Sequence, residues 1–173
     1  MRKMRRGSIL TYISTVYLSA RARKCIQYEV KRYPAVETGG ILIGAPLSHG
    51  NYLVTHATSP GPSAFRRPTV FKKDWSYTIN VLKYLENRHS VIYLGEWHSH
   101  TLAGKPSFQD VIAMKRVALK NKGPLLLLIV SGGEKKAFYL VSPAIVRPRI
   151  KRLTWIEVNN PGEIFSKYEV VVT

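Results

Sequence analysis

Two histidines separated by a single residue, His98 and His100, follow an apolar stretch that ends at Trp97. If the chain stays extended there, side chains two residues apart point the same way, so both imidazoles face one point. Neutral imidazole is a common protein ligand of zinc and similar ions. The spacing therefore indicates a candidate metal site at the end of a strand.

A third candidate ligand, Asp110, follows after a loop that contains Gly104 and Pro106. Ser107 is placed to cap the next helix, which would put Asp110 in its first turn, where a carboxylate is favoured. Ser-x-x-Asp at a helix start is also a capping arrangement in its own right. Taken alone, the stretch around these residues fits either a metal site or a polar turn between a strand and a helix.

A carboxylate far upstream extends the pattern. The segment "VETGGILIG" places Glu37 at the entry of a strand, with two glycines that permit close backbone approach. Together with "WHSH" and "PSFQD" this gives Glu…His-x-His…Ser-x-x-Asp, which resembles the JAMM (JAB1/MPN+/Mov34) family of zinc-dependent isopeptidases. The resemblance covers roughly residues 20–145 and is strongest to the stand-alone prokaryotic JAB branch. "ATSPGPSAFRR" and "YLGEWHSH" are similar to the subgroups from integrative and conjugative elements and from antiphage CBASS operons.

The resemblance implies a role for each matching residue. His98, His100 and Asp110 would hold one Zn²⁺, with water in the fourth position as in catalytic zinc sites. Glu37 would act as general acid–base on that water, and Ser107 would hydrogen-bond the oxyanion of the tetrahedral intermediate. It also implies the JAB1/MPN (cytidine-deaminase-like) fold, an α/β fold with a mixed β-sheet flanked by helices.

The chain departs from the family pattern at two points. Thr101 stands where the family has proline, and nine rather than ten residues separate His100 from Asp110. Both changes fall in the loop between ligands, so they bear on its shape and its contacts with substrate. No ligand type is missing.

The resemblance implies an amide bond at the C-terminus of a ubiquitin-like or otherwise conjugated protein as substrate, and a conjugating-enzyme system in the same operon. Two other functions remain open from the sequence. The net charge of +17 fits an acidic partner or non-specific nucleic-acid binding, as in a RadC-like protein, or serves only solubility. The same zinc chemistry would also serve a small-peptide amidase.

The elements that must position these residues follow from the apolar patterning. Alternating helices and strands predict an α/β class with one domain over 1–173, a core of about 8–158 and a C-terminal tail of about 159–173. No stretch has the length of a membrane span, and the single cysteine fits a cytoplasmic protein. Helices are expected from about 16 to 33, 74 to 87 and 107 to 120, and strands at 39–44, 51–58, 90–97, 124–131, 136–142 and after 146.

Overall fold

A computed structural model describes residues 14–101, 104–132, 135–143 and 149–171 of the chain. The basic start of the chain, the beginning of the expected core and part of the loop between ligands lie outside these residues.

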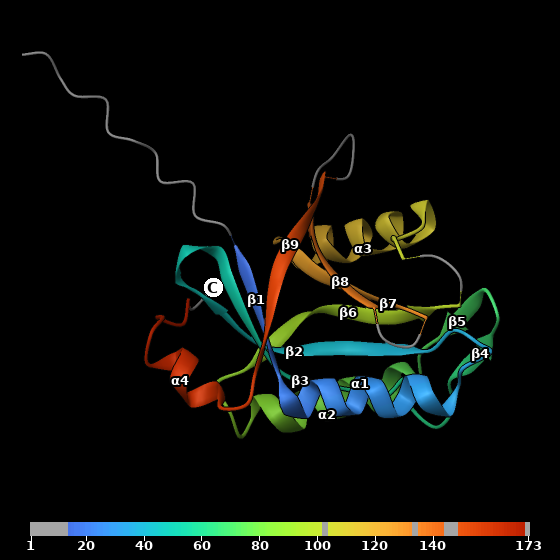
Figure 1. The fold of residues 1–173 in the computed structure, drawn as a ribbon, viewed down its shortest axis with the longest axis horizontal. Helices are drawn as coiled ribbons and strands as arrows, with labels where there is room; N and C mark the ends of the chain where they lie inside the picture. Colours follow the sequence, from blue (N-terminus) through green and yellow to red (C-terminus); the bar gives the residue numbers. More distant parts are fainter. Residues whose placement is uncertain (1–13, 102–103, 133–134, 144–148, 172–173) are drawn as a thin grey trace, which may run out of the picture.

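Seven strands form a closed barrel in the order β1-β3-β2-β6-β7-β8-β9, in which β9 returns to pair with β1 (Figure 1). The pairs of β1 with β3, β1 with β9 and β6 with β7 are parallel, and the others are antiparallel. The expected mixed sheet is therefore confirmed, whereas its closure was not expected. The strands are β1 (Thr15–Ser19), β2 (Gly39–Leu47), β3 (Asn51–Ala57), β6 (Ile92–His100), β7 (Leu125–Ser131), β8 (Lys135–Ser142) and β9 (Arg149–Val158).

The helices cover both faces of the sheet (Figure 1). Helix α1 (Ala20–Arg32) packs on the face that carries Leu42 and Leu126. Helices α2 (Trp75–Glu86) and α3 (Phe108–Lys120) pack on the opposite face, α2 against β2 and α3 against β7. A separate two-stranded hairpin, β4 (Phe65–Arg67) with β5 (Val70–Lys72), lies near the start of β2. A 3₁₀ turn, Ser48–Gly50, joins β2 to β3.

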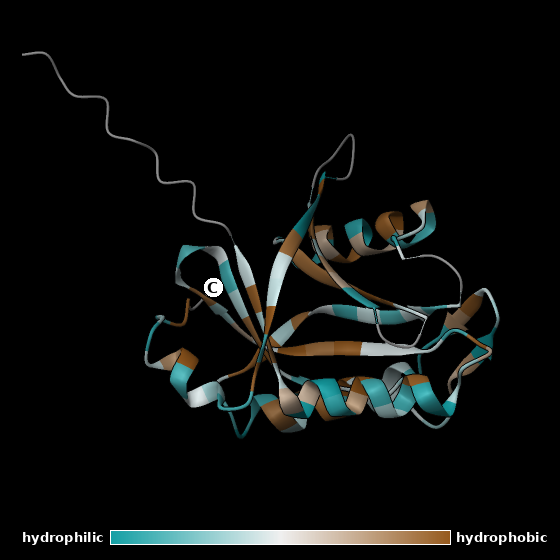
Figure 2. Ribbon diagram, viewed as in Figure 1, coloured by the Kyte–Doolittle hydropathy of each residue, from teal (hydrophilic) through white to brown (hydrophobic). Residues whose placement is uncertain are grey.

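Strand β7 shows why the sequence "LLLLIVS" is apolar throughout: both of its faces are buried. Leu126, Leu128 and Val130 join the cluster that contains α1, while Leu125, Leu127 and Ile129 pack against α3. Figure 2 shows apolar colour on β7 and on part of β2, whose glycine-rich start is pale, in contrast to the largely hydrophilic colour of α1. A strand covered on both faces loses the usual alternation of apolar and polar residues.

The expected helix from residue 16 is wrong in its first part. Residues 15–19 form β1, and the helix begins at Ala20 with the Ser19 side chain accepting from the Ala22 backbone N–H. Val16 and Leu18 are fully buried between β3 and β9. Their spacing of two residues is the strand period, and helix-like spacing from Ala22 onward obscured the change of element.

The other expected helices and strands are present, with two additions. The segment 59–73, expected as a loop, contains the β4–β5 hairpin, and α4 (Pro161–Phe165) follows β9. Ile164 of α4 is buried against Leu47 and Leu53, and Val170 bridges to Leu47. The segment expected as a tail therefore packs on β2 and β3, and the single domain stays a prediction. Among the described residues, the structure contains no helix with the length and apolar character needed to cross a membrane.

Candidate metal centre

The two histidines lie at the carboxyl end of β6, which pairs with β2 on one side and β7 on the other. Strand alternation directs both side chains to the same face, as the sequence predicted. His98 is 8% exposed and His100 is 9% exposed, and their Nε2 atoms are 3.0 Å apart. Two buried imidazoles thus present the same ring nitrogen to one point.

Asp110 completes the cluster from the first turn of α3. One carboxylate oxygen, Oδ1, lies 3.4 Å from His98 Nε2, and the other, Oδ2, lies 3.2 Å from His100 Nε2. The same carboxylate accepts from the Ser107 backbone N–H at 2.6 Å, while Ser107 Oγ accepts from the Asp110 N–H at 3.2 Å. This is a complete capping box. The two readings of the sequence, a cap or a ligand, therefore do not exclude each other.

The surroundings of Asp110 keep it ionised. Its burial opposes the charge and raises the pKa, but hydrogen bonds to His100 and His98, with a further one to Ser107, outweigh that effect. The pKa of Asp110 is therefore held well below its usual range. An anionic carboxylate is the form that binds a metal ion.

The three side chains fit a zinc ion by an independent geometric test. Zinc bonds of about 2.0–2.2 Å in a tetrahedral arrangement place neighbouring ligand atoms roughly 3.3–3.6 Å apart. The two histidine nitrogens lie 3.0 Å apart, and each lies 3.2–3.4 Å from one of the two Asp110 oxygens, His98 from Oδ1 and His100 from Oδ2. With a single ligand atom taken from each residue, the three atoms lie within 4.8 Å of one another. Two neutral nitrogens and one carboxylate oxygen are also a donor set that zinc accepts.

Glu37 precedes β2 and borders the same cleft as His98 and Asp110. Its backbone N–H donates to the Arg67 carbonyl of β4 at 2.9 Å. Burial raises the pKa of the Glu37 carboxyl, the nearby His100 and His98 lower it, and Asp110 raises it, with a net upward shift. A half-buried carboxylate with a raised pKa beside a candidate metal site is suited to taking and returning a proton.

Gly39 explains how Glu37 comes so close to the ligands. Gly39 pairs directly with His98, and a Cβ atom at Gly39 would lie 2.8 Å from His98 Cβ and would also overlap the Trp97 carbonyl oxygen. The close approach of β2 to β6 at this point therefore requires glycine. This confirms the expectation that the glycines permit close backbone approach.

The cleft beside the ligands has a volume of about 490 Å³ and runs between hairpin strand β5 and helix α3. Phe71 and Trp75 supply apolar surface on one side, and Met114 lies on the other. Glu96 also borders it, on the same face of β6 as the histidines, where it pairs with Lys73 at 2.5 Å. This ion pair was not foreseen, because residue 73 lies in a segment expected as a loop.

Comparison with known proteins decides the family. The model of the family described as prokaryotic homologs of the JAB domain matches residues 19–142. The chain belongs to this prokaryotic JAB family. A protein of Escherichia coli (strain TW11681) named "CD-NTase/cGAS isopeptidase" is similar to it, with 30% identity over 120 residues, covering 66% of this chain and 74% of that protein.

A solved structure, that of protein DSY2949 from Desulfitobacterium hafniense, resembles the fold of this JAB domain with a TM-score of 0.63. The match covers 84% of this chain and 94% of the other at 19% sequence identity. At that identity the likeness concerns the fold alone.

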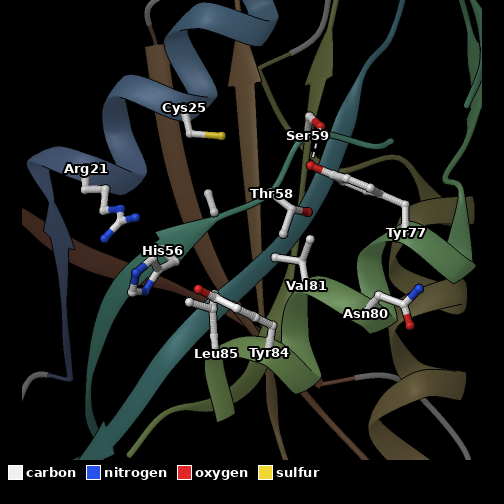
Figure 3. A pocket seen from close by; sticks show the side chains of 11 residues that line it. Arg21, Cys25, His56, Thr58, Ser59, Tyr77, Asn80, Val81, Tyr84 and Leu85 are labelled. Atoms are coloured by element: carbon white, nitrogen blue, oxygen red, sulfur yellow. Dashed lines mark hydrogen bonds between the residues drawn. The ribbon is translucent and has the colours of Figure 1, made fainter. Parts of the chain in front are cut away.

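A larger hollow of about 660 Å³ lies elsewhere in the JAB domain, between α1, β3 and α2 (Figure 3). Arg21 and Cys25 of α1 border it, with His56 of β3 and Tyr84 of α2. None of the three ligands lines it, and neither does Glu37. His56 is therefore outside the candidate metal centre.

Sequence reasoning missed a pair of residues behind the site, Thr38 and Ser99. Each sits next to a site residue and points to the opposite face of the sheet, since alternation separates neighbours. The Thr38 N–H donates to Ser99 Oγ at 3.0 Å, and the Ser99 N–H donates to the Thr38 carbonyl at 2.7 Å. The position of Ser99 between two histidines was the available signal, but it carried no indication of a partner.

Proposed function

We propose that this JAB-family chain is a zinc-dependent isopeptidase of JAMM type, which hydrolyses an amide bond at the C-terminus of a ubiquitin-like or otherwise conjugated protein. The observation that carries the proposal is the convergence of His98 Nε2, His100 Nε2 and the Asp110 carboxylate, with contacts of 3.0–3.4 Å, in a cleft that Glu37 borders. The family relation supports the JAB1/MPN arrangement, of the cytidine-deaminase-like fold, for the barrel and its helices.

His98, His100 and Asp110 are the residues that would hold Zn²⁺ in this proposal. When bound, the ion supplies Lewis-acid polarisation of the scissile carbonyl and lowers the pKa of water towards about 7. The chain's own contribution is to hold three ligand atoms in place before binding, because β6 and the α3 cap already set their positions.

Glu37 is the proposed general base and acid. Its carboxylate takes a proton from the attacking water and returns it to the leaving amine, and its raised pKa makes it a stronger base for the first of these transfers. Ser107 Oγ accepts from the Asp110 N–H, which leaves the hydroxyl proton to donate. Donation of that proton to the oxyanion of the tetrahedral intermediate is worth about 3–4 kcal/mol in comparable sites.

The substrate class rests on two supports. The E. coli relative carries the name of an isopeptidase for CD-NTase/cGAS, so a protein conjugate of that kind is the first candidate substrate. The cleft extends from the ligands along β5 and α3, which suits an extended polypeptide tail. An acidic conjugate would also be attracted by the net charge of +17. We further propose that a conjugating-enzyme system supplies it and that the reaction belongs to antiviral defence.

The test combines zinc analysis with one defined probe. Zinc per chain is measured by elemental analysis on the wild type, His98→Ala and Glu37→Gln, after reloading with Zn²⁺ and removal of excess. The probe is a CD-NTase whose C-terminus is joined by an isopeptide bond to a lysine of a carrier protein, and its cleavage is followed by mass spectrometry.

We expect one zinc per chain in the wild type and Glu37→Gln and none in His98→Ala. Cleavage should be slowed about 100- to 10,000-fold in Glu37→Gln and lost in His98→Ala. Absence of zinc from all three proteins would refute the metal site. Zinc binding with cleavage of short peptide amides but not of the conjugate would support the small-peptide amidase instead. Cleavage at the wild-type rate in Glu37→Gln would remove Glu37 from its proposed role.

A further inference from the structure

A buried ion pair lies behind the candidate site, and neither of its residues lines the cleft. Glu29 of α1 has a side chain only 5% exposed, and its Oε1 lies 2.8 Å from Arg66 Nη2 of β4. The same oxygen accepts from Thr38 Oγ1 at 2.9 Å, and Arg66 Nε donates to Thr38 Oγ1 at 3.3 Å. Buried charges are retained in a fold where they are paired and hydrogen-bonded, and this closed triangle supplies both.

Thr38 connects this triangle to the reacting groups. It is fully buried, it follows Glu37 directly, and its backbone exchanges hydrogen bonds with Ser99. Ser99 in turn lies between the two histidine ligands on β6. The triangle therefore fixes a residue that joins the segment of the proposed base to the strand of the two histidines.

The hairpin holds the same segment by its backbone. The Arg67 carbonyl accepts from the Glu37 N–H at 2.9 Å, one residue away from the Arg66 side chain. The Arg66 guanidinium also lies over the ring of Tyr33, 4.1 Å from its centroid, which is a favourable cation–π distance. Strand β4 is thus attached to the Glu37–Thr38 segment both through a side chain and through the main chain.

We propose that Arg66 and Glu29 are positioning residues for Glu37: they hold its carboxylate at the distance from the metal ligands that proton transfer needs. The inference rests on the proposed function, because it gives Glu37 the role of base. Neither residue touches the cleft or the ligands, so each acts only through Thr38 and the hairpin. Displacement of a catalytic group by about 1 Å costs on the order of 100-fold in rate.

The test is a double-mutant cycle between Arg66 and Glu37. Arg66→Met removes the charge and keeps the length, and we expect kcat on the conjugate probe to fall about 10- to 100-fold with KM and zinc per chain unchanged. In the Glu37→Gln background the same substitution should cost less than about 2-fold, since a residue that acts through another adds nothing once that other is gone. Arg66→Lys, which keeps the charge, should recover part of kcat.

Amide hydrogen exchange gives a second readout that needs no substrate. The N–H groups of Glu37 and Thr38 should exchange at least about tenfold faster in Arg66→Met, while those of β7 should stay protected. Glu29→Gln keeps the side-chain shape, so it serves as a second variant if Arg66→Met does not fold. It should show the same pattern of faster exchange, with a smaller increase in rate. The matched control is Arg23→Met. Arg23 lies on α1, the helix of Glu29, and it also forms an ion pair, with Glu157 at 2.6 Å, but that pair does not lie beside Thr38.

Equal losses of kcat in the wild-type and Glu37→Gln backgrounds would overturn the proposal, as would loss of zinc from Arg66→Met. If the wild type cleaves no probe, the proposed function is what fails. Hydrogen exchange then decides alone: unchanged protection of Glu37 and Thr38 overturns the positioning role, and faster exchange confined to them supports it.

Discussion

At the scale of single residues, Asp110 and Ser107 each combine two tasks. The Asp110 carboxylate closes the capping box of α3 and faces both histidines, while Ser107 caps the helix and is the proposed oxyanion donor. The sequence predicted that His98, His100 and Asp110 lie together, because the residue types and their spacing are local features. It did not predict that cap and ligand coincide, since that depends on how α3 is docked against β6.

Two substitutions at Ser107 separate its structural task from its proposed chemical one. Loss of an N-cap side chain costs about 1 kcal/mol when alanine replaces it and only a few tenths when glycine does. Both substitutions remove the hydroxyl, so we expect kcat to fall about 100- to 1,000-fold in each. Chemical denaturation and kinetics on the conjugate probe measure the two effects, and a kcat loss in Ser107→Ala alone would assign Ser107 to capping only.

Glu37 should make the metal-free protein less stable at neutral pH. Its folded pKa is raised by burial, so the native state binds more protons than the unfolded chain above the unfolded value of about 4.3. Stability from this group is therefore lost as pH rises from that value through the folded pKa. We expect Glu37→Gln to be more stable than the wild type at pH 7, with the difference shrinking at pH 4. Urea unfolding of chelator-treated proteins at the two pH values checks this, and a difference that grows towards pH 4 would contradict it.

At the scale of elements, the strands and helices that carry the ligands were predictable and their neighbours were less so. β6 and α3 have clear boundaries in sequence, a buried run ending in polar residues and a serine cap. The β4–β5 hairpin was missed because each strand has three residues and its stability comes from contacts made elsewhere, such as the ion pair of Arg66 with Glu29. Short strands carry too little periodicity to be recognised.

The contact between β2 and β6 should tolerate no side chain at Gly39. Alanine there would place its Cβ 2.6 Å from the Phe71 ring and 2.8 Å from His98 Cβ. We expect Gly39→Ala to lower stability by about 1–3 kcal/mol, as overpacking does, and to weaken zinc binding by displacing His98.

The matched control is Gly123→Ala, whose Cβ would meet nothing closer than 3.8 Å. Zinc titration and thermal unfolding of both variants give the comparison. Normal zinc affinity in Gly39→Ala would show that the ligands do not depend on this close approach.

At the scale of the whole molecule, the mixed sheet was predictable, but its closure into a barrel was not. Closure depends on β1 pairing in parallel with β9, residues 15–19 with 154–158. No local sequence pattern links segments so far apart. In addition, because residues 16–19 were assigned to a helix, the strand that pairs with β9 was not recognised. The sequence thus indicated which residues form the candidate site but did not predict how the sheet closes.

The net charge of +17 should affect the rate at which the enzyme and its substrate associate, rather than the rate of the chemical step. Exposed charges are screened over about 10 Å at 0.1 M salt, so attraction of an acidic conjugate weakens as salt rises. We expect kcat/KM to fall several-fold between 50 and 200 mM NaCl while kcat stays constant. Steady-state kinetics with an acidic and a neutralised version of the probe measure this. An equal response of both versions would exclude charge attraction as the cause.

The loop between His100 and Asp110 is one residue shorter than the family pattern, yet the ligand atoms still meet at 3.0–3.4 Å. The reason is that β6 and the α3 cap set the ligands from either side, so the loop only has to connect two ends already in place. Insertions and deletions in this loop can therefore accumulate during divergence at little cost to the metal site. A single-residue insertion between Trp97 and His98, by contrast, would turn both imidazoles to the other face of the sheet.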